Sequence, residues 1–198
     1  MRCRLMLAVA LALPAAVAAQ QPGGASVPAV ALKDQYDNPH DVKDLRGDVV
    51  VLIYGDKTSA RTNSELGAKL HVHFHPAAKG KSGVEAQKAP VKPVPGAPAT
   101  ARSPDVKTVP IACFKTDRPA VQAIVRTTVR ANSDGVPVWL DFAGVMSDGF
   151  PFKEGVPNVA VLDVHGRYRY AAAGPPTAQG VERLIAVIEQ LRKEAVTP

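Results

Sequence analysis

The stretch VVVLIYGDKTSARTNSEL, residues 49–66, predicts a buried strand that turns directly into a helix. Its first six residues form an apolar run that is too short for a typical helix and rich in β-branched side chains. Gly55 interrupts the run, and Thr58 or Ser59 is a suitable N-cap for the helix that follows. Because α/β proteins place their chemistry where strands end and helices begin, this turn is the first candidate functional site.

The N-terminal residues are typical of a secretory signal peptide. Two arginines precede an apolar stretch from Leu5 to Ala18, and small residues and two glutamines follow. The stretch is shorter than a membrane span requires, so we expect cleavage near Ala18 or Ala19 and no transmembrane segment in the mature chain. Residues 1–19 are therefore assigned to the signal peptide, and the protein is expected to be periplasmic or secreted.

Cysteine content and charge argue against an internal disulfide and against nucleic-acid binding. The chain has 198 residues, two cysteines and a formal net charge of +6. Cys3 lies in the signal peptide, so Cys113 is the single cysteine of the mature chain and an internal disulfide is excluded. The net positive charge of the mature chain is concentrated in residues 76–104, which contain no aromatic side chain. Nucleic-acid binding is not expected, because it needs positive charge on a folded face or a dedicated arm.

Residues 76–104 are rich in proline, alanine and lysine, and we expect them to form a flexible insert. A segment with so little apolar surface cannot offset the entropy lost when it becomes ordered. Around the insert, strand and helix patterns alternate. The expected elements are strands at 49–54, 106–114 and 136–142, a helix after Asp117, a hairpin at 156–174 that turns at His165 and Gly166, and a last helix at 177–194. This order predicts one α/β domain, residues 28–198, with a mixed β-sheet flanked by helices.

In two of these elements, the strand at 106–114 and the helix after Asp117, the residue pattern predicts where the element lies in the fold. Pro110 cannot donate a hydrogen bond to a neighbouring strand, so it suits only an edge position or a strand end. The helix after Asp117 is expected to bury an apolar stripe and to leave two arginines in solvent. The stripe is Val121, Ile124, Val125 and Val129, and the arginines are Arg126 and Arg130.

Three stretches together resemble the redoxin branch of the thioredoxin fold, which includes peroxiredoxins and periplasmic thiol-disulfide proteins. They are LKDQYDNPHDVKDLRGDVVVLIYGD at 32–56, VPVWLDFAGVMSDGFPFKEGVPNVAVLDVHGRYRY at 136–170, and the last helix. The resemblance implies a thioredoxin-like mixed sheet. It also implies a cis peptide bond between Val156 and Pro157, in the family's proline loop.

The family places a Cys-x-x-Cys or Thr-x-x-Cys motif at the first strand-to-helix turn, where the helix N-terminus lowers the pKa of the thiol. In this chain the turn reads Thr58-Ser59-Ala60-Arg61, and both cysteine positions are vacant. A hydroxyl group cannot carry reversible two-electron redox chemistry. The turn could instead bind a small anion through its backbone N–H groups and Arg61, with Pro157 as a further ligand-binding residue, or it could only cap the helix.

Three of the five histidines lie in LHVHFHP, residues 70–76. On a strand His71, His73 and His75 would share one face, and on a helix His71 and His75 would still be neighbours. At least two imidazoles therefore converge, which is the minimum for a copper, zinc or nickel site. The alternative is a polar, partly exposed helix end. The other two histidines lie in turns and are expected to be ordinary surface residues.

The sequence leaves two functions of different classes. The favoured one is an exported, thioredoxin-like binding or accessory module without redox activity, whose partner is an exported protein or a small anion. The other is a thiol-dependent redoxin, a peroxidase or thiol-disulfide oxidoreductase, in which Cys113 is the reactive thiol. A lone cysteine late in a strand is most often buried and unreactive, so we expect a protein that is not an enzyme.

Overall fold

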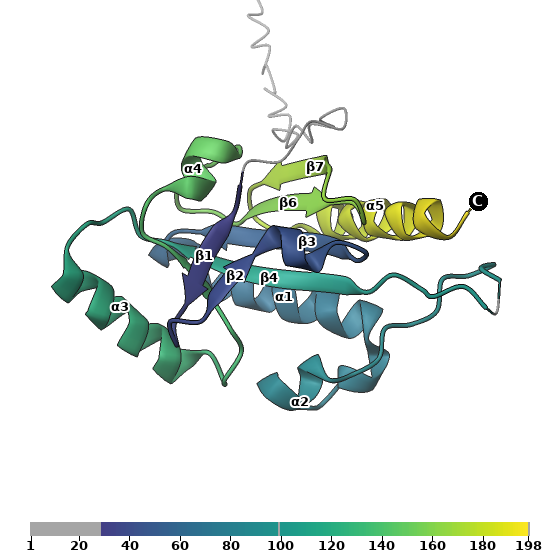
Figure 1. Cartoon of the computed structure of the whole chain (residues 1–198), viewed down its shortest axis with the longest axis horizontal. Helices are drawn as coiled ribbons and strands as arrows, with labels where there is room; N and C mark the ends of the chain where they lie inside the picture. Colours follow the sequence, from purple (N-terminus) through teal and green to yellow (C-terminus); the bar gives the residue numbers. More distant parts are fainter. Residues whose placement is uncertain (1–28, 99, 198) are drawn as a thin grey trace, which may run out of the picture.

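The structure is a computed structural model that describes residues 29–98 and 100–197. Seven strands form one mixed sheet in the order β2-β1-β5-β4-β3-β6-β7 (Figure 1). The strands are β1 (Ala31–Asp34), β2 (Pro39–Asp41), β3 (Val49–Gly55), β4 (Val106–Cys113), β5 (Trp139–Asp141), β6 (Asn158–Leu162) and β7 (Tyr168–Ala173). β3 pairs in parallel with β4 and antiparallel with β6, so the expected mixed sheet is confirmed.

Five α-helices and three short 3₁₀ helices connect the strands in the described part of the chain. The α-helices are α1 (Ala60–Phe74), α2 (Gly83–Gln87), α3 (Pro119–Asn132), α4 (Val145–Gly149) and α5 (Ala178–Val196). The 3₁₀ helices are η1 (Val42–Leu45), η2 (Lys57–Ser59) and η3 (Pro76–Ala78). Within the described residues, no helix combines the length and the apolar character that crossing a membrane requires. The signal peptide predicted at residues 1–19 lies outside the described residues.

β3 separates the two hydrophobic cores of the domain. All seven of its residues are buried, as the apolar run predicts. Val49, Val51 and Ile53 pack with apolar residues of α1 and α5 on one face of the sheet. The residues between them belong to the second core, with side chains from β1, β5 and α4. The strand therefore fixes the position of α1, which begins at its end.

The C-terminal part of the chain confirms the sequence-based expectations. β6 and β7 form an antiparallel hairpin, and Gly166 in its turn has a φ of 76°, which glycine adopts readily. α5 buries an apolar stripe against the sheet, as its period predicts. The buried apolar residues of this stripe are Val181, Leu184, Ile188 and Leu191.

Pro110 lies inside a long strand, but it is paired with a neighbouring strand on one side only, as a residue of an edge strand is. β4 pairs with β3 along its whole length, and Pro110 lies opposite Ile53. On the other side β5 pairs with β4 only from Ile111 onward. Pro110 thus has a strand neighbour on one side only, which explains why a residue without an N–H group is tolerated there.

The expected orientation of α3 is wrong for the first half of its apolar stripe. No residue of α3 is buried, and the side chains of Val121 and Ile124 are 37% and 67% exposed. Of the two arginines expected in solvent, Arg130 is exposed as expected, whereas Arg126 is partly buried. Both lie over aromatic rings of neighbouring segments. A guanidinium group can stack on a ring and keep its polar contacts, so it competes with valine and isoleucine for the inner face.

The expectation that residues 76–104 lack regular structure is wrong in part. The segment contains η3 and α2, and Ala78, Ala89 and Val94 are buried. Small apolar side chains at these positions reach the core even though the segment has few large ones. Lys92 N also donates a hydrogen bond to Phe74 O at the end of α1. The flexibility of the insert stays a prediction.

Candidate functional site

The turn between β3 and α1 is organised by a carboxylate rather than by a hydroxyl. Asp56 Oδ1 accepts hydrogen bonds from the backbone N–H groups of Thr58 and Ser59, at 2.9 and 3.1 Å. Its Oδ2 accepts a third bond, of 2.6 Å, from Gly155 N in the loop before β6. Three N–H groups from two segments thus converge on one carboxylate.

Ser59, one of the two residues that the sequence named as the helix cap, is the N-cap residue of α1, but the role of Asp56 as the cap of η2 was missed. The Ser59 side chain makes no capping bond to α1, and its hydroxyl donates instead to Asp56 O at 3.0 Å. The available signal was the position of Asp56, because aspartate is among the strongest N-cap residues and commonly binds N–H groups two and three residues ahead.

Hydrogen bonding keeps this carboxylate ionised. Burial acts to raise the pKa of Asp56, but the bonds from Gly155, Ser59 and Thr58 outweigh that effect and lower the pKa below its usual value. A negative charge therefore occupies the helix N-terminus at neutral pH, where the helix dipole favours it.

The structure does not bring Arg61 into this turn as an anion-binding group. Its side chain is 92% exposed and forms an ion pair with Glu65 on the same helix, at 2.9 Å. The N–H groups of Thr58 and Ser59, which were expected to bind an anion, already bind Asp56. An external anion would have to displace that carboxylate, and anion binding here stays a prediction.

The loop before β6 lies against the turn, but its proline is not in the expected conformation. In the described residues no peptide bond is cis, so the bond between Val156 and Pro157 is trans. Asn158 Nδ2 donates to Val156 O at 3.0 Å, and Gly174 N donates to Pro157 O at 2.9 Å. These bonds hold the loop in the trans form, which is intrinsically the more stable isomer.

We expect Asp56→Ala to lower the free energy of unfolding by about 1 kcal/mol at pH 7, because it removes the cap of η2, the 3₁₀ turn that leads into α1. A carboxylate with a lowered pKa stabilises the fold above about pH 4, its unfolded pKa, and this contribution disappears as the pH falls further. The difference between wild type and variant should therefore shrink in acid. Urea unfolding at pH 7, 5 and 3 measures this stability difference. The control is Glu154→Ala, which removes an exposed carboxylate from the loop before β6. An equal loss at all three pH values would contradict the capping role.

Cys113 lies at the end of β4, in the strand beside this turn. It is half-buried and pairs in register with Asp141 of β5, while its neighbour Ala112 pairs with Gly55. Burial raises the pKa of the Cys113 thiol to about 12, and the charge of Asp141 adds to the effect. Reactive cysteines have lowered pKa values, so this environment is the opposite of an activating one.

The three histidines of the predicted cluster do not converge. α1 continues to Phe74, so His71 and His75 lie on one side of its last turn with ring centroids 4.3 Å apart. His73 points elsewhere, and its Nε2 lies 2.9 Å from Lys92 Nζ. The helical alternative considered for the sequence is therefore the correct one, and it brings two of the three imidazoles together.

The ring nitrogens of this pair have other partners. His75 Nδ1 lies 3.1 Å from His71 O, and His75 Nε2 lies 2.7 Å from Asp105 Oδ1. His71 Nε2 donates to Ala86 O of α2 at 2.9 Å. Across residues 29–98 and 100–197, no three His, Cys, Asp or Glu side chains form a group that could hold a metal ion. Binding of copper, zinc or nickel stays a prediction, and it would require these bonds to break.

His40 is not the ordinary surface residue that its place in a turn suggests. Its Nε2 lies 2.9 Å from Oδ2 of the buried Asp34, and its ring stacks on Trp139 with centroids 5.1 Å apart. Hydrogen bonds to Asp34, the largest from His40, outweigh burial and lower the pKa of this carboxyl group. His165, in contrast, is exposed in the β6–β7 turn, as expected.

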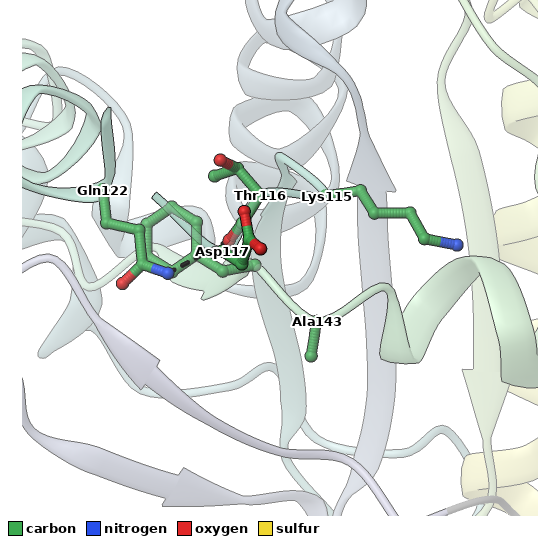
Figure 2. A pocket seen from close by; sticks show the side chains of 6 residues that line it. Lys115, Thr116, Asp117, Gln122 and Ala143 are labelled. Carbon is green, nitrogen blue, oxygen red and sulfur yellow. Dashed lines mark hydrogen bonds between the residues drawn. The ribbon is translucent and has the colours of Figure 1, made fainter. Parts of the chain in front are cut away.

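An open concavity of about 560 Å³ lies where β4 and β5 end and α3 begins (Figure 2). It is lined by Lys115, Thr116, Asp117, Gln122, Phe142 and Ala143. Gln122 Nε2 donates to Thr116 O at 3.0 Å, and the Lys115 side chain extends away from Gln122 (Figure 2). Sequence reasoning missed this site. The signal was its place after two parallel strands, because α/β folds bind ligands beyond the carboxyl ends of such strands.

Comparison with known proteins identifies the fold. No protein-family model matches the sequence, and no curated protein matches it. A secreted thiol-disulfide isomerase of Corynebacterium glutamicum is 14% identical and superposes with a TM-score of 0.54, over 94% of this chain and 98% of that one. An exposed lipoprotein thioredoxin of Streptococcus pneumoniae is 10% identical with a TM-score of 0.53, over 82% of this chain and 98% of that one.

A further solved structure is that of BsSco, a member of the Sco family of cytochrome c oxidase assembly proteins. It is 11% identical, with a TM-score of 0.51 over 88% of this chain and 97% of that one. At these identities the likeness concerns the fold alone. The chain thus has the thioredoxin-like fold that its sequence predicts, and it lacks cysteines at the turn where the resemblance places them.

Proposed function

We propose that the protein is an exported, thioredoxin-like module that binds a partner without redox chemistry. One observation carries the proposal. The turn between β3 and α1, where the resemblance places a reactive thiolate, holds the carboxylate of Asp56 bound by three backbone N–H groups. A carboxylate cannot form a disulfide or reduce a peroxide. This arrangement supports a scaffold that is kept for binding rather than for electron transfer.

The alternative, a redoxin that uses Cys113, has less support. A thiolate is the reactive form of cysteine, and the pKa of this thiol is raised to about 12 by burial, with the charges of Asp141 and Asp56 adding to the effect. Within the described residues it is the sole cysteine, and it is free, so an internal disulfide cannot form during a catalytic cycle. Turnover would need a thiol from another molecule.

Export is part of the proposal. The pattern of residues 1–19 supports a cleaved signal peptide. Two of the structural neighbours are a secreted isomerase and an exposed lipoprotein, which is consistent with the same location. The expected partner is therefore an exported protein or a small anion, in the periplasm or outside the cell.

Redox assays test the non-catalytic part of the proposal. We expect wild-type protein to show no insulin reduction and no peroxidase turnover above the buffer blank, and Cys113→Ser to behave identically. Turnover in the wild type that vanishes in Cys113→Ser would overturn the proposal in favour of the redoxin alternative.

Capture from the exported fraction tests the binding part. A partner retained equally by wild type and Cys113→Ser, and eluted without reductant, is the expected result. A partner retained only as a mixed disulfide of the wild type would contradict binding without redox chemistry.

A further inference from the structure

We propose that α3 opens as a separate unit, because polar and arginine–aromatic contacts rather than buried apolar side chains hold it against the domain. The opening would widen the concavity in which α3 forms one wall. This motion of α3 does not depend on what the protein binds.

Arg126 provides the central contact of α3. Its guanidinium carbon lies 5.0 Å from the centre of the Phe142 ring, and its Nε lies 3.0 Å from Asp37 Oδ1. Arg126 Nε has no hydrogen-bond partner of suitable geometry among the described residues, so the Asp37 contact is charge attraction without an aligned bond. The Asp37 side chain is 55% exposed, which places this ion pair within reach of solvent and salt.

Arg130 makes the second contact, one turn further along α3. It lies 5.1 Å from the centre of the Tyr36 ring and donates to Gln35 O at 2.8 Å. Both arginines therefore reach the turn between β1 and β2. Arg126 Nε is shielded from solvent, whereas Arg130 is exposed. At the other end of the helix, Gln122 donates to Thr116 O.

The apolar anchoring of α3 is weak compared with that of the other long helices. α1 buries Leu66, Leu70 and Phe74, whereas α3 buries no residue. Its most apolar side chain, Ile124, is 67% exposed. Helices with little buried apolar surface open at a lower free-energy cost than the rest of a domain, because few contacts are lost.

The C-terminal end of α3 would be the pivot of the motion, because the buried Gln35 holds it: Gln35 Nε2 donates to Ser133 Oγ at 2.9 Å and to Val136 O at 2.8 Å. The chain leaves the helix through Asp134 and Gly135, with φ values of 49° and 75°, so a short left-handed turn separates α3 from β5. Gln122 belongs to α3, and Phe142 belongs to the segment after β5, and both line the concavity. Movement of α3 away from Phe142 would therefore enlarge this site.

Hydrogen–deuterium exchange of the full-length protein, read by mass spectrometry on peptides, tests the proposal. In 20 mM NaCl we expect the amides of α3 to exchange at least tenfold faster than those of α1 and α5. Arg126→Gln should accelerate α3 by a further factor of about ten, because it removes an ion pair and a cation–π contact. Raising NaCl to 500 mM should accelerate amide exchange in α3 of the wild type, because salt screens the Arg126–Asp37 ion pair. The effect should be smaller in Arg126→Gln, which lacks this pair.

Arg118→Gln is the matched control, since it removes the same charge from an exposed position at the start of the same helix. It should leave the exchange of α3 within a factor of two of the wild type. Exchange of α3 in step with α1 and α5 in the wild type would overturn the proposal. So would an Arg126→Gln effect that is equal in all three helices, because that result would mean global rather than local unfolding.

Discussion

Replacing Arg192 with leucine is expected to lower the free energy of unfolding by about 3 kcal/mol. Arg192 lies on α5 and is fully buried. Its guanidinium donates to Lys92 O at 2.6 Å and to Pro104 O at 3.0 Å, and its Nη1 lies 3.4 Å from Glu189 Oε2. Leucine would leave two buried carbonyl groups without donors, and this loss exceeds what its own apolar surface gains.

The two carbonyl groups lie at the two ends of the segment 93–103, so Arg192 also holds together the two ends of this second half of the insert. We therefore expect Arg192→Leu to be cleaved by trypsin within the insert faster than the wild type is. Arg102, which is followed by Ser103, is the available cleavage site in this segment, because Pro93 after Lys92 blocks trypsin there.

Urea unfolding followed by the fluorescence of Trp139, the single tryptophan and a buried one, measures the stability loss. Arg183→Leu is the control, because Arg183 is an exposed arginine of the same helix. Its effect should stay within about 0.5 kcal/mol. Equal midpoints for wild type and Arg192→Leu would show that the buried contacts do not anchor the insert.

Alkylation of Cys113 by iodoacetamide at pH 8 is expected to be about a hundredfold slower than that of an unhindered thiol. With a pKa of about 12, its thiolate fraction is about a thousandfold smaller than that of a thiol with an ordinary pKa. The stronger nucleophilicity of a more basic thiolate recovers about a factor of ten. The rate should rise about tenfold per pH unit up to at least pH 10, since the thiol titrates above that range.

The measurement uses a Cys3→Ser background, so that Cys113 is the single thiol. In 8 M urea the same protein should react at the rate of a free cysteine, which shows that the folded environment causes the protection. A plateau in the native rate near pH 7 or 8 would mean a lowered pKa. In that case Cys113 would again be a candidate for the reactive thiol of a redoxin.

The sequence predicts much of the fold because local periodicity encodes it. The apolar run of residues 49–54 and the stripe of α5 match buried faces of the structure. The strand and the helix are both predicted from the spacing of apolar residues. This spacing does not depend on which other element the buried face packs against. The absence of cysteine from the turn at Thr58 is likewise a property of the sequence alone, and it removes the family's redox groups.

α3 shows where local periodicity is insufficient. Its amphipathic pattern is strong enough to predict a helix, but it does not say which face turns inward. The Phe142 ring, after β5, holds Arg126 partly buried on the inner face, and the Tyr36 ring, in the distant β1–β2 turn, contacts Arg130, which stays exposed. A side chain that is both apolar along its stem and charged at its tip fits either face, so only the neighbours decide.

Polar contacts were the other feature that tertiary structure decided. Asp56 and Gly155 are 99 residues apart, and Arg192 is 100 residues from Lys92. A carboxylate or guanidinium group can bond to any backbone group that the fold brings near, and the sequence carries no periodic signal for such a pairing. The sequence by itself thus determined the strands, the principal helices and the loss of the redox cysteines. Only the packing of distant segments decided that the Asp56 carboxylate lies in the turn without cysteines and that Arg192 holds part of the insert against the domain.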